Sequence, residues 1–259
     1  MASEISPRAE ISSNAKIGNN CKIFPFVYIE DDVVIGDNCI IFPFVSICAG
    51  TRMGNNNKIH QGSVIAALPQ DFDFCGEKTE CIIGNNNIIR ENVVINRATH
   101  TGGKTVLGDN NVLMEGVHIS HDTKVDNDCV FGYGTKIAGD CEIGHGAIFS
   151  SSVIENAGTC VGTGAMIQAG TTFSKDVPPY IICTKHSEYG GVNFTMGRSY
   201  GVDEKTLKHI ANAYRLVYLS NTSLFDAVKQ IEDQVPDGPE IRNVIQFMRN
   251  SKLGVIGKR

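Results

Sequence analysis

The sequence predicts a mainly β protein, a parallel β-helix followed by an α-helical C-terminal domain. Aliphatic residues or Met recur at every sixth position from Ile5 to Ile65, and the period returns downstream as far as Phe173. A six-residue period matches neither an α-helix nor a simple alternating strand, and it fits short strands joined by corners. The period then stops. We therefore assign residues 1–184 to a solenoid and 185–259 to a helical domain.

A second period gives the number of strands in one coil. The segment Ile-Phe-Pro-Phe-Val at 23–27 recurs eighteen residues later, at 41–45. Three six-residue units therefore make one coil of a triangular prism, with aliphatic side chains inside and coils about 4.8 Å apart. A solenoid of this kind needs its ends capped.

Two stretches interrupt the period. Residues 66–82 and 96–106 lack the aliphatic series and contain Pro or Gly, so we expect loops that leave the prism. Loops on a rigid scaffold often carry binding residues. Further on, Glu155 takes one of the interior positions.

The C-terminal region predicts three helices that close the end of the prism. An amphipathic pattern covers 203–220, with Asp203 as its N-cap. Two more helices are expected at about 223–235 and 239–251, the last with Pro239 in its first turn.

Composition limits the function classes. The formal net charge is −5, which argues against a nucleic-acid-binding protein. Residues 185–259 hold 11 Lys and Arg against 8 Asp and Glu, so this basic region could contact an acidic partner. The first residues contain no apolar signal segment, and no run approaches 18 apolar residues, so we expect a cytoplasmic protein without integral membrane association.

The nine cysteines form no Cys-x-x-Cys pair. Four share one slot of the repeat: Cys21, Cys39, Cys129 and Cys141. We predict that they are small buried packing residues in a reducing compartment, with no metal bound. A disulfide between Cys21 and Cys39 is geometrically conceivable, because the two would be stacked neighbours.

The segment 116–122 concentrates reactive side chains. His118 and His121 flank Ile119, which takes an interior position, so both histidines should face solvent or a neighbouring subunit. Histidine titrates near neutrality and can serve as a general base. Asp122 follows directly and is a candidate to orient the imidazole or to stabilise its cation.

Several motifs, in this order along the chain, resemble the UDP-N-acetylglucosamine O-acyltransferases that begin lipid A synthesis. They are Gln70-Asp71, Gly76-Glu77, Ile89-Arg90-Glu91, His118-x-x-His121-Asp122, Asp176-Val177-Pro178-Pro179-Tyr180, Gly191-Val192-Asn193 and Ala211-Asn212-Ala213-Tyr214-Arg215. The resemblance implies a left-handed coil and a homotrimer with active sites between subunits. It also implies transfer of a 3-hydroxyacyl group from acyl carrier protein to the 3-hydroxyl of UDP-N-acetylglucosamine, without a cofactor.

The resemblance also implies roles for single residues. His121 matches the catalytic base. Gly139, eighteen residues on, matches the position whose backbone N–H stabilises the oxyanion. His118 is expected to hydrogen-bond substrate, and Gln70 and Asp71 match residues that hold the sugar and its nucleotide.

The other substrate-binding candidates are Asp140, Asn156, Ala169, Asn193 and Arg198. Most lie where the chain departs from the family. Asp140 replaces a His, Asn156 begins an Asn-Ala pair in place of His-Gln, and Ala169 takes the position of the acyl-chain ruler, typically Gly. Arg198 lies beside Ser199, which replaces a phosphate-facing Arg.

Three other functions are compatible with the repeat. An N-acyltransferase acting on a UDP-amino sugar shares the coil, but it carries an N-terminal uridine-binding domain for which a period that starts at Ile5 leaves no room. A zinc hydratase of the γ-carbonic-anhydrase type needs three converging His, and only His118 and His121 are close. A non-catalytic paralogue is suggested by the departures.

Overall fold

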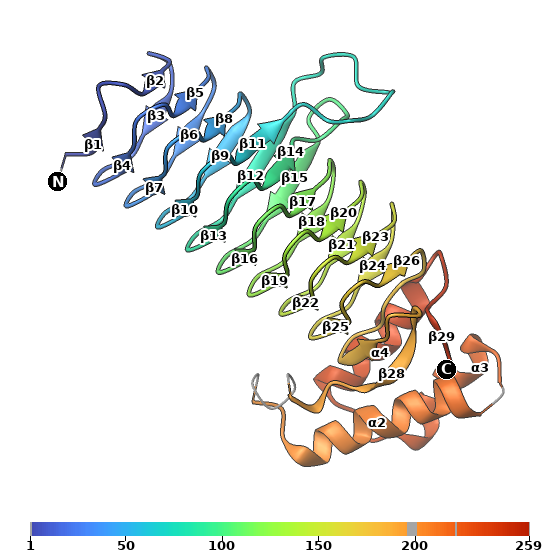
Figure 1. Cartoon of the computed structure of the whole chain (residues 1–259). Helices are drawn as coiled ribbons and strands as arrows, with labels where there is room; N and C mark the ends of the chain where they lie inside the picture. The colour runs from blue at the N-terminus through green and yellow to red at the C-terminus, as the bar shows by residue number, and fades with distance from the viewer. Residues whose placement is uncertain (1, 196–200, 221, 259) are drawn as a thin grey trace.

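Over the residues that the structure describes, the chain forms a triangular solenoid closed at its C-terminal end by three helices (Figure 1). The computed structural model describes residues 2–195, 201–220 and 222–258. Each coil contributes one strand to each of three sheets, and consecutive coils pair in parallel. The predicted architecture of three six-residue units per coil is therefore confirmed.

The strands are short and fall on three faces. The first sheet holds β1 Glu4–Ile5, β4 Lys22–Ile23, β7 Ile40–Ile41, β10 Lys58–Ile59, β13 Ile88–Ile89, β16 Val112–Leu113, β19 Val130–Phe131, β22 Ile148–Phe149, β25 Met166–Ile167, β27 Ile181–Cys183, β28 Glu188–Val192 and β29 Gly257–Lys258. The second holds β2 Glu10–Ile11, β5 Tyr28–Ile29, β8 Ser46–Ile47, β11 Val64–Ala67, β14 Val94–Asn96, β17 His118–Ile119, β20 Lys136–Ile137, β23 Ile154–Glu155 and β26 Thr172–Phe173. The third holds β3 Lys16–Ile17, β6 Val34–Ile35, β9 Thr51–Met53, β12 Glu80–Ile83, β15 Lys104–Leu107, β18 Lys124–Val125, β21 Glu142–Ile143 and β24 Cys160–Val161.

The register explains why one coil is eighteen residues long. Ile119 pairs with Ile137, and the aliphatic series fills the interior. Corner residues adopt positive φ, for example Asp122 at 59° and Asp140 at 60°. Asn, Asp and Gly tolerate this conformation best, which accounts for their recurrence at the corners.

The loops that leave the prism are shorter than predicted. β11 continues to Ala67 and β12 begins at Glu80, so the first loop is confined to 68–79. The second is confined to 97–103, between β14 and β15. The predicted limits were too wide because strand pairing continues past the last aliphatic residue before each loop and begins ahead of the first one after it, where Cys81 and Thr105 take an interior position.

The three predicted helices are present as α2 Glu204–Leu219, α3 Leu224–Gln234 and α4 Pro239–Asn250. The Asp203 side chain accepts from the N–H groups of Lys205 and Thr206, as expected for an N-cap. The buried Tyr214 hydroxyl donates to the Pro179 carbonyl at 2.6 Å, which ties α2 to the last coil.

The region 185–259 is not entirely helical. β28 runs antiparallel to β27 and pairs with β29, so the first sheet continues into the region that the sequence assigned to helices. Because β28 lacks the six-residue series, periodicity could not reveal it.

The four cysteines that share one slot are buried, as predicted. Cys21 and Cys39 are free thiols, so the conceivable disulfide is absent. Burial raises the pKa of the Cys129 thiol to about 12, which keeps it protonated and unreactive.

Candidate active site

His121 lies at the corner between β17 and β18, outside the prism. Its side chain was expected to face solvent or a neighbouring subunit, but only 8% of the residue is exposed. Both loops contribute to the cover, because Asp71 and Thr99 contact the imidazole. The ring is thus turned out of the prism, but within the single chain the two loops lie between it and solvent.

One edge of the ring is held by hydrogen bonds at Nδ1. Nδ1 lies 3.0 Å from Asp122 Oδ2 and 2.9 Å from Thr99 Oγ1. The backbone N–H of Thr99 donates to the same carboxylate oxygen at 3.0 Å. Because a carboxylate only accepts, its bond to Nδ1 favours the tautomer with hydrogen there, which leaves a lone pair on Nε2.

The other edge of the ring faces a carboxylate from the first loop. Asp71 Oδ2 lies 3.4 Å from Nε2 of His121. Asp71 was predicted to hold the sugar, and here it occupies the side of the imidazole from which a base would take a proton. A hydroxyl that approached Nε2 would therefore contact the Asp71 carboxylate as well, unless that carboxylate moved aside.

Gly139 lies directly against the imidazole. A Cβ at position 139 would be 2.5 Å from Cε1 and 2.7 Å from Nε2 of His121. The coils are in register here, since Asp140 N–H donates to the His121 carbonyl at 3.1 Å. Among the described residues no acceptor receives the Gly139 N–H. This amide is therefore free to bind an oxygen beside the ring.

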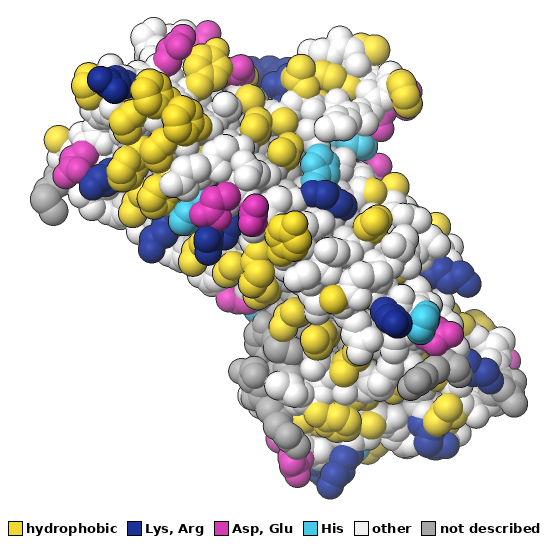
Figure 2. All heavy atoms as spheres, viewed as in Figure 1, with side chains coloured by type: hydrophobic (Ala, Val, Ile, Leu, Met, Phe, Trp, Pro, Cys, Tyr) yellow, Lys and Arg dark blue, Asp and Glu magenta, His cyan; other side chains and the backbone are white. Residues whose placement is uncertain are grey.

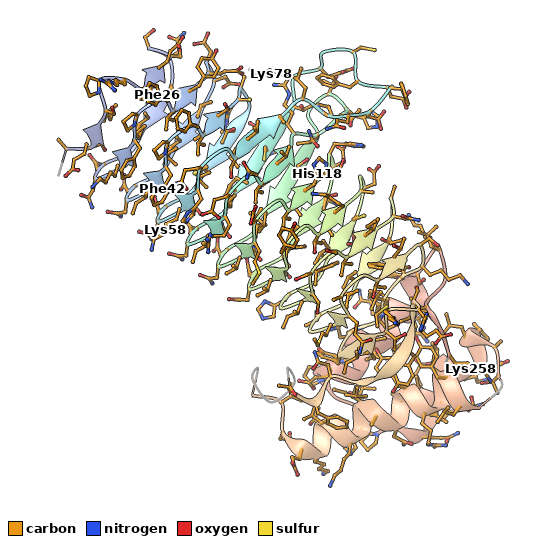
Figure 3. The ribbon with its side chains drawn as sticks, in the orientation of Figure 1. Phe26, Phe42, Lys58, Lys78, His118 and Lys258 are labelled. Atoms are coloured by element: carbon orange, nitrogen blue, oxygen red, sulfur yellow. The ribbon has the colours of Figure 1, made fainter. Side chains whose placement is uncertain are left out.

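His118 lies one strand position before Ile119, half buried on the face of the solenoid below the loops (Figure 3). Desolvation, followed by the positive charge of Lys136 one coil away, lowers the pKa of its imidazole. His118 is therefore neutral at physiological pH, and it can donate or accept a hydrogen bond.

The remaining predicted residues fall on different edges of the prism. Asp140 and Asn156 are exposed on the same edge as His121, and Gln70 is exposed on the first loop. Ala169 is exposed on a second edge, between β25 and β26. Asn193 is buried and donates from Nδ2 to the Gly164 carbonyl at 3.1 Å, near the third edge. Arg198 lies outside the described residues.

Sequence reasoning missed two residues that organise the site. Thr99 contacts both members of the His121–Asp122 pair. Arg97 donates from Nη1 to the Ala49 carbonyl at 3.0 Å and lies 5.6 Å from the Phe74 ring centroid, so it ties the first loop to the solenoid. Both residues belong to the second loop, which lies outside the six-residue repeat, so the repeat could not predict which residues they contact.

Comparisons with known proteins identify the family. A family model for UDP N-acetylglucosamine O-acyltransferase domain 2 matches residues 176–256, and a bacterial transferase hexapeptide model matches 14–41, 32–67 and 104–139. The crystal structure of a UDP-N-acetylglucosamine acyltransferase from Bacteroides fragilis is 47% identical, with a TM-score of 0.95, and the match covers 97% of this chain and 99% of that one. The chain belongs to the UDP-N-acetylglucosamine O-acyltransferase family.

Two further members of the family superpose over almost the whole chain. The Francisella novicida enzyme is 30% identical with a TM-score of 0.94, covering 98% of this chain and 94% of that one. The Campylobacter jejuni enzyme is 25% identical with a TM-score of 0.92, covering 99% and 100%. The chain is thus an acyltransferase, and it shares the left-handed β-helix of this family.

The described residues contain no group of three His, Cys, Asp or Glu side chains arranged to hold a metal ion. Their helices are also too short or too polar to span a membrane.

Proposed function

We propose that this enzyme transfers a 3-hydroxyacyl group from acyl carrier protein to the 3-hydroxyl of UDP-N-acetylglucosamine, the first step of lipid A biosynthesis, in the cytoplasm. The observation that carries the proposal is the His121 imidazole, which bonds to Asp122 at Nδ1 and packs against Gly139. Family membership supports the choice of substrates.

The proposed reaction uses three groups of this edge. Nε2 of His121 takes the proton of the sugar hydroxyl as the oxygen attacks the thioester carbonyl carbon. Asp122 stabilises the imidazolium, and the Gly139 N–H donates to the oxyanion of the tetrahedral intermediate. Collapse of the intermediate breaks the carbon–sulfur bond, and the imidazolium returns its proton to the thiolate. Gln70, Asp71 and His118 would hold the sugar nucleotide.

We further propose that the enzyme acts as a homotrimer. His121 and Ala169 lie on different edges of the prism, so a substrate that contacts both must bind between two chains. Exposed apolar side chains also gather over the N-terminal coils (Figure 2), and Phe26 and Phe44 stack there at 5.2 Å with positive φ. An aromatic residue in this conformation is strained, which supports a role in contact with another subunit.

Turnover measurements test the proposed function. The enzyme is mixed with UDP-N-acetylglucosamine and 3-hydroxyacyl carrier proteins of graded chain length, beside a His121→Ala variant. We expect acylated product with a defined range of chain lengths and none above background from the variant. An absence of product at every chain length would favour a non-catalytic paralogue, and activity towards a UDP-amino sugar alone would favour the N-acyltransferase.

Ala169 is predicted to limit the length of the acyl group. Removing its methyl group in Ala169→Gly should deepen the acyl site and shift the preferred chain by about one or two carbons towards longer groups. The ratio of kcat/KM for adjacent chain lengths measures the shift. An unchanged ratio would mean that the chain ends elsewhere.

The carrier protein is expected to dock on the basic surface of α2. Lys205, Lys208 and Arg215 are exposed there, and Arg198, the fourth predicted contact, lies outside the described residues. Reversing the three charges should raise KM for the acidic carrier protein by about tenfold while kcat stays near wild type, since long-range attraction affects association more than chemistry. If the KM of the triple variant for carrier protein equalled that of wild type at both low and high salt, α2 would not be the docking surface.

A further inference from the structure

Thr99 is the one residue of the second loop that contacts both members of the proposed catalytic pair. Only 2% of it is exposed. Its hydroxyl lies 2.9 Å from His121 Nδ1, and its backbone N–H donates to Asp122 Oδ2 at 3.0 Å. The bond to Asp122 is available to any residue with a backbone N–H, whereas the contact with the His121 ring needs the threonine hydroxyl.

We infer that Thr99 is a positioning residue, which fixes the plane of the His121 imidazole and the orientation of the Asp122 carboxylate so that Nε2 faces the acceptor hydroxyl. The inference rests on the proposed function, because it assumes that His121 is the base.

A carboxylate alone cannot fix the ring. The bond between Asp122 and Nδ1 sets one distance, but both side chains can still rotate about their terminal torsions. Thr99 adds a bond at each side of that contact, one to the carboxylate and one to the ring nitrogen. Three bonds among three residues restrict both rotations.

The backbone around the pair supports the same arrangement. Asp122 has a positive φ of 59°, and its N–H donates to Thr105 Oγ1 at 2.9 Å. The second loop returns to the prism past Gly103, where a Cβ would be 2.7 Å from the His100 carbonyl oxygen and 3.2 Å from Asp122 Oδ1. The second loop thus lies against Asp122 at Thr99 and again at Gly103. These two contacts explain how a short loop holds Thr99 in place.

A hydroxyl suits this position chemically. The Nδ1 hydrogen can be shared between Asp122 Oδ2 and Thr99 Oγ1, which both lie within hydrogen-bond distance. The hydroxyl oxygen accepts more strongly when the ring is an imidazolium, so it stabilises the charged form that arises during proton transfer. The Thr99 hydroxyl is uncharged, so it stabilises the imidazolium without attracting a cation to the site.

The test compares Thr99→Val, which keeps the shape but removes the hydroxyl, with Thr99→Ser, which keeps the hydroxyl. We expect Thr99→Val to lower kcat about tenfold, with KM for UDP-N-acetylglucosamine changed less than twofold. The acid limb of the pH profile of kcat/KM should move about half a unit to lower pH, because the imidazolium loses an acceptor. Thr99→Ser should restore kcat and the pH profile to near wild type.

The other titratable groups that face His121 are Asp122, Asp71 and His118, and they are the same in both variants. Thr51→Val is the matched control, since this buried threonine donates to the Cys48 carbonyl and contacts neither member of the pair. Its kcat and pH profile should stay at wild-type values.

Wild-type kcat in Thr99→Val, a loss that Ser does not restore, or an unshifted acid limb would each overturn the positioning role. Failure of the proposed function gives a different result, because wild type would then form no acylated UDP-N-acetylglucosamine, or His121→Ala would be as active as wild type. A dead His121→Ala beside an unaffected Thr99→Val would reject the inference and leave the proposed base in place.

Discussion

Gly139→Ala is expected to lower kcat/KM by about 10³-fold, a larger loss than the one expected of Thr99→Val. The added methyl group would be 2.5 Å from Cε1 and 2.7 Å from Nε2 of His121, closer than any stable contact. The ring must therefore move away from the coil that carries the proposed oxyanion donor. A displacement of about 1 Å costs on the order of 10²-fold, and loss of an oxyanion donor costs 10²–10³-fold.

Gly257→Ala is the matched control, because a Cβ at that position meets no atom within 4 Å. Neither Gly139 nor Gly257 has a positive φ, so backbone strain cannot account for a difference between the two variants. We expect the control to keep wild-type kcat/KM. If Gly139→Ala also stays within tenfold of wild type, the contact between ring and glycine is not needed for catalysis.

The proximity of His121 and Gly139 could be predicted from the sequence alone. Eighteen residues make one coil, and no loop interrupts the chain between the two positions, so they must be stacked neighbours. Ala169 follows His121 by 48 residues, which is not a multiple of eighteen. The repeat therefore places Ala169 on a different edge of the prism from His121. Periodicity therefore fixes both which residues meet and which lie on other edges.

The residues that surround the imidazole could not be predicted in this way. Asp71 and Thr99 lie in loops without a period, so no register places them beside His121. The burial of His121 depends on these loops and was missed for the same reason. A strand such as β28, which lacks the repeat, is invisible to periodicity too.

Glu155 breaks the aliphatic series and is fully enclosed in the prism. It pairs in register with Ile137 and Phe173 and is 1% exposed. Thr159 Oγ1 lies 2.8 Å from both Glu155 Oε1 and the Asn156 carbonyl oxygen, while Glu155 Oε2 has no partner among the described residues. One hydroxyl hydrogen cannot serve both oxygens well, whereas a protonated Glu155 can donate to Thr159 and leave that hydrogen for the carbonyl.

Burial raises the pKa of the Glu155 carboxyl from 4.5 to about 8, with a smaller contribution from the negative charge of Asp176. The folded chain then keeps a proton that the unfolded chain releases above pH 4.5, so this group lowers the free energy of unfolding as pH rises from about 4.5 to 8. The loss is about 1.4 kcal/mol per pH unit, on the order of 4 kcal/mol between pH 5 and 8.

Glu155→Ile restores the interior aliphatic and should remove this slope, so that the variant gains stability over wild type steadily from pH 5 to pH 8. Urea unfolding of the full chain at fixed protein concentration, in steps of half a pH unit, measures the difference. Glu142→Gln is the control, because Glu142 is exposed on a strand and, among the described residues, forms its ion pair with Lys124. It should follow the wild-type slope. If the free energy of unfolding had the same pH dependence in wild type and in Glu155→Ile, Glu155 would be ionised in the folded chain. That result would contradict the protonated carboxylic acid inferred from its hydrogen bonds and burial.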